Sequence, residues 1–286
     1  MKFIVMGSGT SSGVPVIGCS CPVCVSADER DKRLRSSLYI KGERGERIVI
    51  DVGPDFRFQA LRAGIRYLDF VLLTHSHADH VHGLDDLRQL SLIKPLRIYG
   101  NSESINDVRE RFAYIWRKTQ RGGGKPKIDL FTLENEFSFE NLTITPIPVK
   151  HGSMNVLGWK IRENAPSETG KGFVEAAYIT DCSFIGALSM SALKNISCLV
   201  LGALREARHE THFSFDEALE TVKKIESPFL RQVFFTHISH EHSHAYICGH
   251  CAQWRKKNDM SQISVLPACD NLQIPLYPNN GPGRNR

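Results

Sequence analysis

Residues 71–80 read VLLTHSHADH, so an apolar run ends in three histidines and one aspartate packed close together. An apolar run of this kind predicts a buried β-strand. Alternate side chains of a strand point the same way, so His75 and His77 can converge on one ion. Asp79 and His80 lie just past the turn and can face a second ion. Imidazole and carboxylate groups suit zinc, manganese or iron, so the segment predicts a metal-binding edge.

Three further residues of the types that bind metals each close an apolar strand of their own. His151 follows TPIPVK, Asp181 follows AAYIT, and His237 follows QVFFT. A bridging carboxylate is the natural way to hold two cations close together, and Asp181 fits that role. A single histidine at a strand end would be explained more simply as a capped or solvated side chain. Four such strand ends together favour a dinuclear site.

Composition sets the class of protein in which this edge lies. With 286 residues, 41% of them hydrophobic and 23% charged, the chain can bury the core of one large α/β domain. A net charge of +5 suits an anionic substrate but does not by itself indicate nucleic-acid binding. The apolar run at the N-terminus is too short for a signal peptide, and no stretch approaches transmembrane length. We therefore expect a cytoplasmic protein with no membrane association.

The periodicity of apolar residues predicts strands alternating with helices in a single domain over 1–277, followed by a disordered tail at 278–286. The helix expected at 102–116 has a serine as its candidate N-cap. Helices are expected at 55–64, 83–93, 102–116 and 215–225. Strands are expected at 2–8, 37–53 (as a hairpin), 68–75, 96–100, 137–152, 156–163, 176–182, 196–204 and 232–240.

Three of the eight cysteines, Cys19, Cys21 and Cys24, sit together in GCSCPVC. Structural disulfides are rare in a reducing compartment, where such a cluster is more often a zinc site. The other cysteines are scattered or weakly paired. The cluster therefore indicates a metal site separate from the histidine-rich edge.

The segment THSHADH resembles the HxHxDH signature of the metallo-β-lactamase superfamily. The resemblance implies an αββα sandwich of the α/β class, with a two-metal site along the edge where the strands end. Lactamases proper commonly bind the second ion through a cysteine, whereas hydrolases of phosphodiesters carry an aspartate at the place of Asp181. The ligand order extends over almost the whole chain. The implied dinuclear zinc or manganese site has His75, His77, His151 and Asp181 on one ion, and Asp79, His80, Asp181 and His237 on the other.

The segments GTSSGVPVIGCSCPVC and THISH narrow this resemblance to the PhnP family of cyclic phosphodiesterases. In that family, three cysteines and one histidine bind a structural zinc ion. The resemblance assigns these roles to Cys19, Cys21, Cys24 and His240. A closed Cys₃His tetrahedron would tie the N-terminal loop to the strand edge that carries His237.

The segment THFSFDEAL resembles the histidine motif that PhnP-like and tRNase Z-like enzymes use near the scissile phosphate. The resemblance implies that His212 stabilises the phosphate or donates a proton to the leaving oxygen. It also leaves Asp79 to orient the attacking hydroxide. Ser214 and Glu217 have the spacing of a helix capping box, a structural role compatible with the catalytic one.

The expected function is hydrolysis of a small phosphodiester, with a cyclic ribose phosphate favoured, by hydroxide activated between two divalent ions. A tRNase Z-like endoribonuclease shares the metal ligands, but the chain has no long basic arm for gripping tRNA, so a nucleic-acid partner is not favoured. A PqqB-like cofactor-biosynthesis protein has a similar cysteine cluster. A non-catalytic metal-binding scaffold is a further alternative, although a complete ligand set disfavours it.

Two segments and the oligomeric state stay open at this stage. The Gly-rich basic segment 117–128 could be a substrate lid or a solvated loop. The His- and Cys-rich segment 242–251 is expected to be a surface loop, apart from the role of neighbouring His240. A homodimer is compatible with the sequence.

Overall fold

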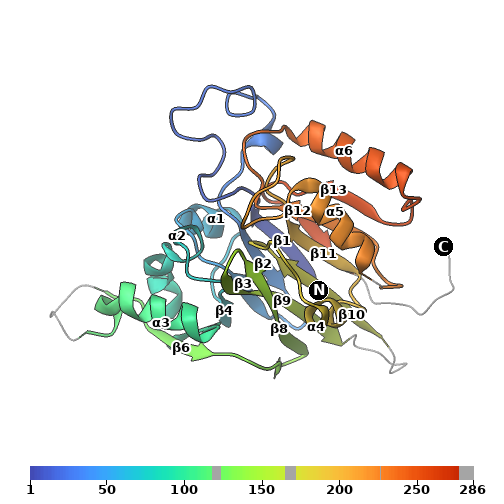
Figure 1. Ribbon diagram of the computed structural model, residues 1–286. Helices are drawn as coiled ribbons and strands as arrows, with labels where there is room; N and C mark the ends of the chain where they lie inside the picture. Colours follow the sequence, from blue (N-terminus) through green and yellow to red (C-terminus); the bar gives the residue numbers. More distant parts are fainter. Residues whose placement is uncertain (118–123, 165–171, 226, 277–286) are drawn as a thin grey trace.

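The computed structural model describes residues 1–117, 124–164, 172–225 and 227–276, which form two sheets of seven strands each (Figure 1). The tail at 278–286 lies outside these residues. The first sheet runs in the order β14 (Gln273–Pro275), β1 (Lys2–Gly7), β2 (Ser37–Lys41), β3 (Arg47–Ile50), β4 (Phe70–Leu72), β5 (Leu96–Gly100) and β6 (Ile128–Thr132). The second runs in the order β13 (Ser264–Pro267), β12 (Gln232–Thr236), β11 (Cys198–Gly202), β10 (Phe173–Ile179), β9 (Met154–Asn164), β8 (Leu142–His151) and β7 (Phe137–Phe139).

The two sheets pack face to face through a shared apolar core. Phe3 and Phe70 of the first sheet and Trp159 and Tyr178 of the second are fully buried in this layer. The opposite face of each sheet is also apolar, which is why most strands read as continuous hydrophobic runs rather than alternating ones.

Helices cover the outer face of each sheet, which confirms the αββα sandwich. Buried residues of the helices on each side share a core cluster with the sheet that they cover. On the first sheet lie α1 (Phe56–Arg62), α2 (Ala78–Val81), the 3₁₀ helix η2 (Leu84–Ser91), α3 (Ser102–Arg111) and the 3₁₀ turn η3 (Ala113–Ile115). On the second lie α4 (Ala187–Ala192), α5 (Phe215–Lys224) and α6 (His244–Lys257), while the 3₁₀ turn η1 (Glu29–Asp31) belongs to the N-terminal loop.

The helix predicted at 83–93 is present as the 3₁₀ helix η2 at Leu84–Ser91. Two other local predictions were wrong. The cap of α3 is Asn101, whose side chain accepts a hydrogen bond from Ser104 N at 2.8 Å, and not a serine. The expected surface loop at 242–251 is largely the first half of α6, because Ser243 caps it and the buried Ile247 and Cys251 lie one turn apart on its inner face.

The parallel strands create the functional edge. β3 to β6 run parallel in one sheet, and β10 to β13 run parallel in the other. The carboxyl ends of parallel strands meet at one edge of a sheet, and ligands of open α/β sheets bind there. The predicted metal-binding residues after β4, β10 and β12 are therefore brought to that edge. Among the described residues, no helix combines the length and apolarity needed to cross a membrane.

Candidate metal centre

The structure brings all seven residues of the predicted dinuclear site together as two adjoining clusters. Within each cluster, one potential ligand atom from every member lies within 4.8 Å of the others. The clusters come from four segments, at or just after the carboxyl ends of β4, β8, β10 and β12, so they assemble only when both sheets are in place. The first cluster contains His75, His77, His151 and Asp181, and the second contains Asp79, His80, Asp181 and His237.

Asp181 joins the two clusters through its two carboxylate oxygens. Its Oδ1 lies 3.3 Å from His80 Nε2 and 3.1 Å from His237 Nδ1. Its Oδ2 lies 3.8 Å from His75 Nε2 and 4.0 Å from His151 Nε2. One oxygen therefore faces each cluster, which is the arrangement expected of a carboxylate that bridges two cations.

Hydrogen bonds fix the orientation of the first and last histidines of the signature, His75 and His80. His80 Nδ1 donates to Asp51 Oδ2 at 2.7 Å. The hydroxyl of Thr74 also donates to Asp51 Oδ2, at 2.7 Å, so its oxygen can accept from His75 Nδ1 at 3.0 Å. With both Nδ1 atoms acting as donors, the Nε2 lone pairs of His75 and His80 are left for a metal ion.

Asp51 is the functional residue that sequence reasoning missed. It is fully buried, follows β3, and has a φ of 63°, in a region that residues other than glycine rarely adopt. Its Oδ1 accepts from Thr74 N at 2.8 Å, so the carboxylate holds both the backbone and the His80 side chain of the signature. The one signal in the sequence was an aspartate near the end of the apolar run IVIDV. This run includes the end of β3, which pairs with β4, the strand that precedes the signature.

Hydrogen bonds also orient the two histidines contributed by the second sheet. His151 Nδ1 lies 2.7 Å from the carbonyl oxygen of Thr211, to which it donates. His237 Nε2 lies 3.1 Å from Thr10 Oγ1, and its Nδ1 lies 3.3 Å from Ser36 Oγ. His237 has a φ of 58°, so its backbone, like that of Asp51, is strained beside the site.

Helix α3 supports the signature from the outside. The Ser76 hydroxyl donates to Asp107 Oδ2 at 2.6 Å, and the Arg111 guanidinium donates to the Ser76 carbonyl oxygen at 2.7 Å. Both partners lie on α3, one turn apart. The loop between His75 and His77 is therefore held on its outer side while the imidazoles face inward.

The chemistry of the donors fits divalent cations. His75 Nε2, His80 Nε2 and Asp79 Oδ2 are buried atoms without a hydrogen-bond partner in the described part of the chain. Leaving buried polar atoms unpaired is costly, and a metal ion would satisfy all three. The His80 imidazole is also surrounded by three buried carboxylates, those of Asp51, Asp79 and Asp181. Their buried negative charge requires compensating positive charge.

The protonation states agree with metal binding. Burial lowers the pKa of His75 well below its usual value, with His80 adding to the effect, and burial also lowers the pKa of His77 and His237. These imidazoles are therefore neutral at pH 7. Burial disfavours the charged form of His80, but Asp181 and the other carboxylates outweigh it and raise the pKa of His80. In the holoprotein a metal ion would take the place of that proton.

His212 lies at the rim of the site, as predicted, without belonging to either cluster. Its ring stacks on that of His237 with centroids 4.9 Å apart, and its Nδ1 lies 3.9 Å from Asp181 Oδ2. Burial, reinforced by His237, lowers the pKa of His212 to about 3. The imidazole is therefore neutral at pH 7 and can donate a hydrogen bond. The capping box of Ser214 and Glu217 is present at the start of α5.

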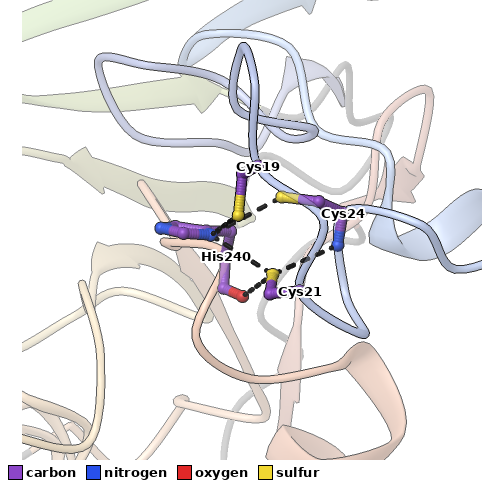
Figure 2. A group of neighbouring side chains, drawn as sticks. All are labelled: Cys19, Cys21, Cys24 and His240. Atoms are coloured by element: carbon purple, nitrogen blue, oxygen red, sulfur yellow. Dashed lines mark hydrogen bonds between the residues drawn. The ribbon is translucent and has the colours of Figure 1, made fainter.

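The three cysteines of the N-terminal loop surround one ring nitrogen of His240 (Figure 2). The sulfur atoms of Cys19, Cys21 and Cys24 lie 3.5, 3.4 and 3.5 Å from His240 Nδ1. In a tetrahedral zinc site, bonds of about 2.3 Å to sulfur and about 2.0 Å to nitrogen place these atoms roughly 3.5 Å apart. Hydrogen bonding from Cys24 N and from His240 lowers the pKa of Cys21 to about 6, which favours the thiolate that zinc requires.

Arg33 connects the cysteine cluster to the predicted metal-binding edge. Its buried guanidinium donates to the carbonyl oxygens of Ser239 at 2.6 Å and His242 at 3.1 Å, on either side of His240. Asp31 pairs with Arg33 at 3.3 Å and accepts from His244 N at 2.7 Å. The loop that carries His240 is thereby held in place, three residues beyond His237.

The described residues of the basic segment 117–128 contribute no ligand to these clusters. Lys118 and Arg121 lie outside the described residues. Lys125 Nζ donates to the carbonyl oxygen of Tyr114 at 2.8 Å, and Lys127 Nζ donates to that of Leu92 at 2.7 Å. These two lysines hold the described end of the 117–128 segment, and the choice between a substrate lid and a solvated loop stays a prediction.

Comparisons with known proteins agree with this geometry. A family model for the beta-lactamase superfamily domain matches residues 46–238, which include the signature, His151, Asp181 and His237. A crystal structure described as a new diphosphatase from the PhnP family is 32% identical to this chain, with a TM-score of 0.78 over 96% of this chain and 97% of that one. The zinc-bound PqqB of Methylobacterium extorquens aligns over 96% of this chain and all of that one with a TM-score of 0.73, but at 19% identity the likeness shows the fold alone.

Another relative is described by a different activity from that of the PhnP-family structure. An octanoyltransferase of Porphyromonas gingivalis is 40% identical over 243 residues, which are 84% of this chain and 46% of that protein. The match therefore spans less than half of the relative's length.

Proposed function

We propose that this chain, which belongs to the metallo-β-lactamase superfamily and is PhnP-like within it, hydrolyses a small phosphodiester of the cyclic ribose phosphate class. Independently of the substrate, the family match and the clusters of candidate ligands support a divalent-metal-dependent hydrolase. The observation that carries the proposal is Asp181, whose two oxygens face different clusters.

A phosphodiester resists hydrolysis because its negative charge repels the nucleophile and its leaving alkoxide is poor. When bound, two divalent ions polarise the phosphoryl oxygens and lower the pKa of the attacking water. The chain's own part is to place the ions and hold them apart through Asp181. Because one carboxylate spans both clusters, Asp181 would hold both ions, and the other candidate ligands would fix their positions before reaction begins.

Two side chains are placed to handle protons. Asp79 is a candidate ligand of the second cluster, and its carboxylate would also accept a hydrogen bond from the attacking water and orient it. His212 lies beside Asp181 and is stacked on His237. From there it can donate to a phosphate oxygen or to the leaving alkoxide.

Two relatives favour specific alternative substrates. The PhnP-family structure is described as a diphosphatase, so a phosphoric anhydride is the nearest alternative, and the same groups would act on it. The octanoyltransferase relative favours an acyl ester or thioester as a second candidate. Metal sites of this kind can polarise a carbonyl as well as a phosphoryl group.

Turnover of a matched panel tests the proposal. Purified protein supplied with manganese or zinc should hydrolyse bis-p-nitrophenyl phosphate and a 2′,3′-cyclic ribose phosphate much faster than p-nitrophenyl phosphate, a monoester. Preference for a diphosphate diester would select the anhydride, and preference for an octanoyl thioester would select the acyl candidate. Cleavage of precursor tRNA above that of small diesters would favour a tRNase Z-like enzyme. No turnover of any of these with metal bound would leave the scaffold or a PqqB-like role.

The leaving-group dependence of His212→Ala tests the role of that residue. If His212 protonates the leaving alkoxide, kcat on diesters with poor leaving groups should fall by about 10²-fold or more. The loss should shrink for p-nitrophenyl diesters, whose leaving group needs little protonation. Metal content should not change, since His212 belongs to neither cluster. Equal losses for good and poor leaving groups would indicate phosphate binding, and no loss would remove His212 from the mechanism.

A further inference from the structure

A groove of about 510 Å³ lies between α4 and α5 on the outer face of the second sheet, outside the metal clusters. Its floor is apolar: Ile185 and Phe213 are almost completely buried, and Met190 of α4 packs against the same core. Its opposite wall is the polar side of α5, from Ser214 to Lys224. The lining residues run from Ser214, at the start of α5, to Lys224, at its end.

The groove begins where the metal site ends. Phe184 lies three residues after Asp181, and Phe213 directly follows His212, so the two segments that supply site residues also line the groove. They are joined by a hydrogen bond from Phe213 N to the Cys182 carbonyl oxygen at 2.7 Å. At no more than about 3.6 Å per residue, the Cα atom of Phe184 lies within roughly 11 Å of that of Asp181. A group attached to a phosphate at the metal edge can therefore reach the groove.

Phe184 gives the groove an aromatic wall that the protein itself leaves open. Its side chain is 61% exposed, although its backbone is fixed, since its carbonyl oxygen accepts from Lys150 N at 2.9 Å. An exposed aromatic ring on a fixed backbone beside an active site is a platform for a flat ring. Arg208 also lines the groove and is highly exposed, and its guanidinium is a second planar group.

The charged residues that line the groove determine which substituents on such a ring would bind favourably. Two cations, Arg208 and Lys224, stand against four carboxylates, so the formal balance is negative. A second phosphate is therefore disfavoured in the groove. Each carboxylate already bonds to a group of the chain: Glu206 to Tyr246, Asp216 to His250, Glu217 to Ser214 and Arg208, and Glu220 to Trp254. A carboxylate can accept about four hydrogen bonds, so amino groups still find acceptors there. The carboxylates are those of Glu206, Asp216, Glu217 and Glu220.

We propose that this groove holds the base of a nucleotide whose phosphate lies at the metal edge, with Phe184 as the stacking platform and the acidic wall accepting hydrogen bonds from exocyclic amino groups. The preferred substrates are then amino-bearing nucleoside diesters rather than sugar phosphates without a base. The inference rests on the proposed function, because it places a phosphodiester at the metal clusters.

The test compares Phe184→Ala with Leu188→Ala, a matched control. Leu188 is 90% exposed on the neighbouring helix α4 and does not line this groove. For 2′,3′-cyclic AMP, Phe184→Ala should raise KM about tenfold while kcat changes less than about twofold, as expected for the loss of one stacking partner. For a 2′,3′-cyclic ribose phosphate without a base, neither constant should change. Phe184→Tyr should restore the wild-type KM. Unchanged KM for cyclic AMP in Phe184→Ala would overturn the proposal.

A binding measurement separates this inference from the proposed function. Calorimetry with AMP and with ribose 5-phosphate needs no turnover. We expect wild-type protein, with metal bound, to bind AMP about tenfold more tightly, and Phe184→Ala to remove that preference. This result would support the groove as a base site even if cyclic diesters proved not to be substrates. Equal binding of the two ligands by wild-type protein, or a preference for an octanoyl ester that depends on Phe184, would overturn the inference.

Discussion

Asp181→Asn is expected to lower kcat/KM for diester substrates by about 10³-fold or more. The amide keeps the size of the side chain and the hydrogen bond from Thr180 Oγ1, which is 3.0 Å long in the wild type. It removes the charge that both clusters share. Several kcal/mol of charge stabilisation are at stake at such a site, and about 4 kcal/mol corresponds to 10³-fold. Steady-state kinetics at saturating metal measures the effect.

Asp129→Ala is a suitable control for this variant. Asp129 is an exposed aspartate on β6 of the other sheet, so its removal changes net charge without touching either cluster. Its turnover should match that of the wild type. Loss of less than about tenfold in Asp181→Asn would mean that the carboxylate does not hold the two ions together.

Replacing each of the two histidines of THISH by alanine is expected to affect different properties, activity for one and stability for the other. His237→Ala removes a candidate ligand of the second cluster, so diesterase activity should be lost while the chain stays folded. His240→Ala opens the Cys₃His cluster, and so should lower the melting temperature first. An ion present at about a thousand times its Kd contributes about 4 kcal/mol to stability, which corresponds to roughly 10 °C in a chain of this size.

Thermal unfolding and zinc content, measured for both variants, separate these outcomes. His82→Ala is the matched control, because His82 is exposed, directly follows α2, and belongs to neither cluster. It should keep both activity and stability. If His237→Ala and His240→Ala kept the wild-type melting temperature and lost activity equally, the division into a structural and a catalytic site would be wrong.

The metal-site residues could be predicted because each follows an apolar strand, and parallel strands bring such residues to one edge. The resemblance to known families then supplied the grouping into two clusters and the pairing of the cysteines with His240. Asp51 was missed because one aspartate after a strand looks like a turn residue, and its bond to His80 depends on the pairing of β3 with β4.

Other features depend on tertiary context that the sequence does not reveal. Helix α6 was mistaken for a loop because its histidines and cysteines obscure a narrow apolar stripe, of which Ile247 and Cys251 are the buried part. The groove beside Phe184 is formed because α4 and α5 both pack on the second sheet and both contribute residues to its lining. Neither element suggests a binding site when its own residues are considered alone.

Metal titration combined with diester turnover tests the central claim most directly. Mild chelation should leave about one zinc ion per chain, held by the Cys₃His cluster, and no activity on bis-p-nitrophenyl phosphate. Adding about two further equivalents of manganese or zinc should restore turnover in the wild type but not in Asp181→Asn. Full diester turnover by protein that holds a single ion, or turnover that does not respond to added metal, would contradict a two-metal site built on Asp181.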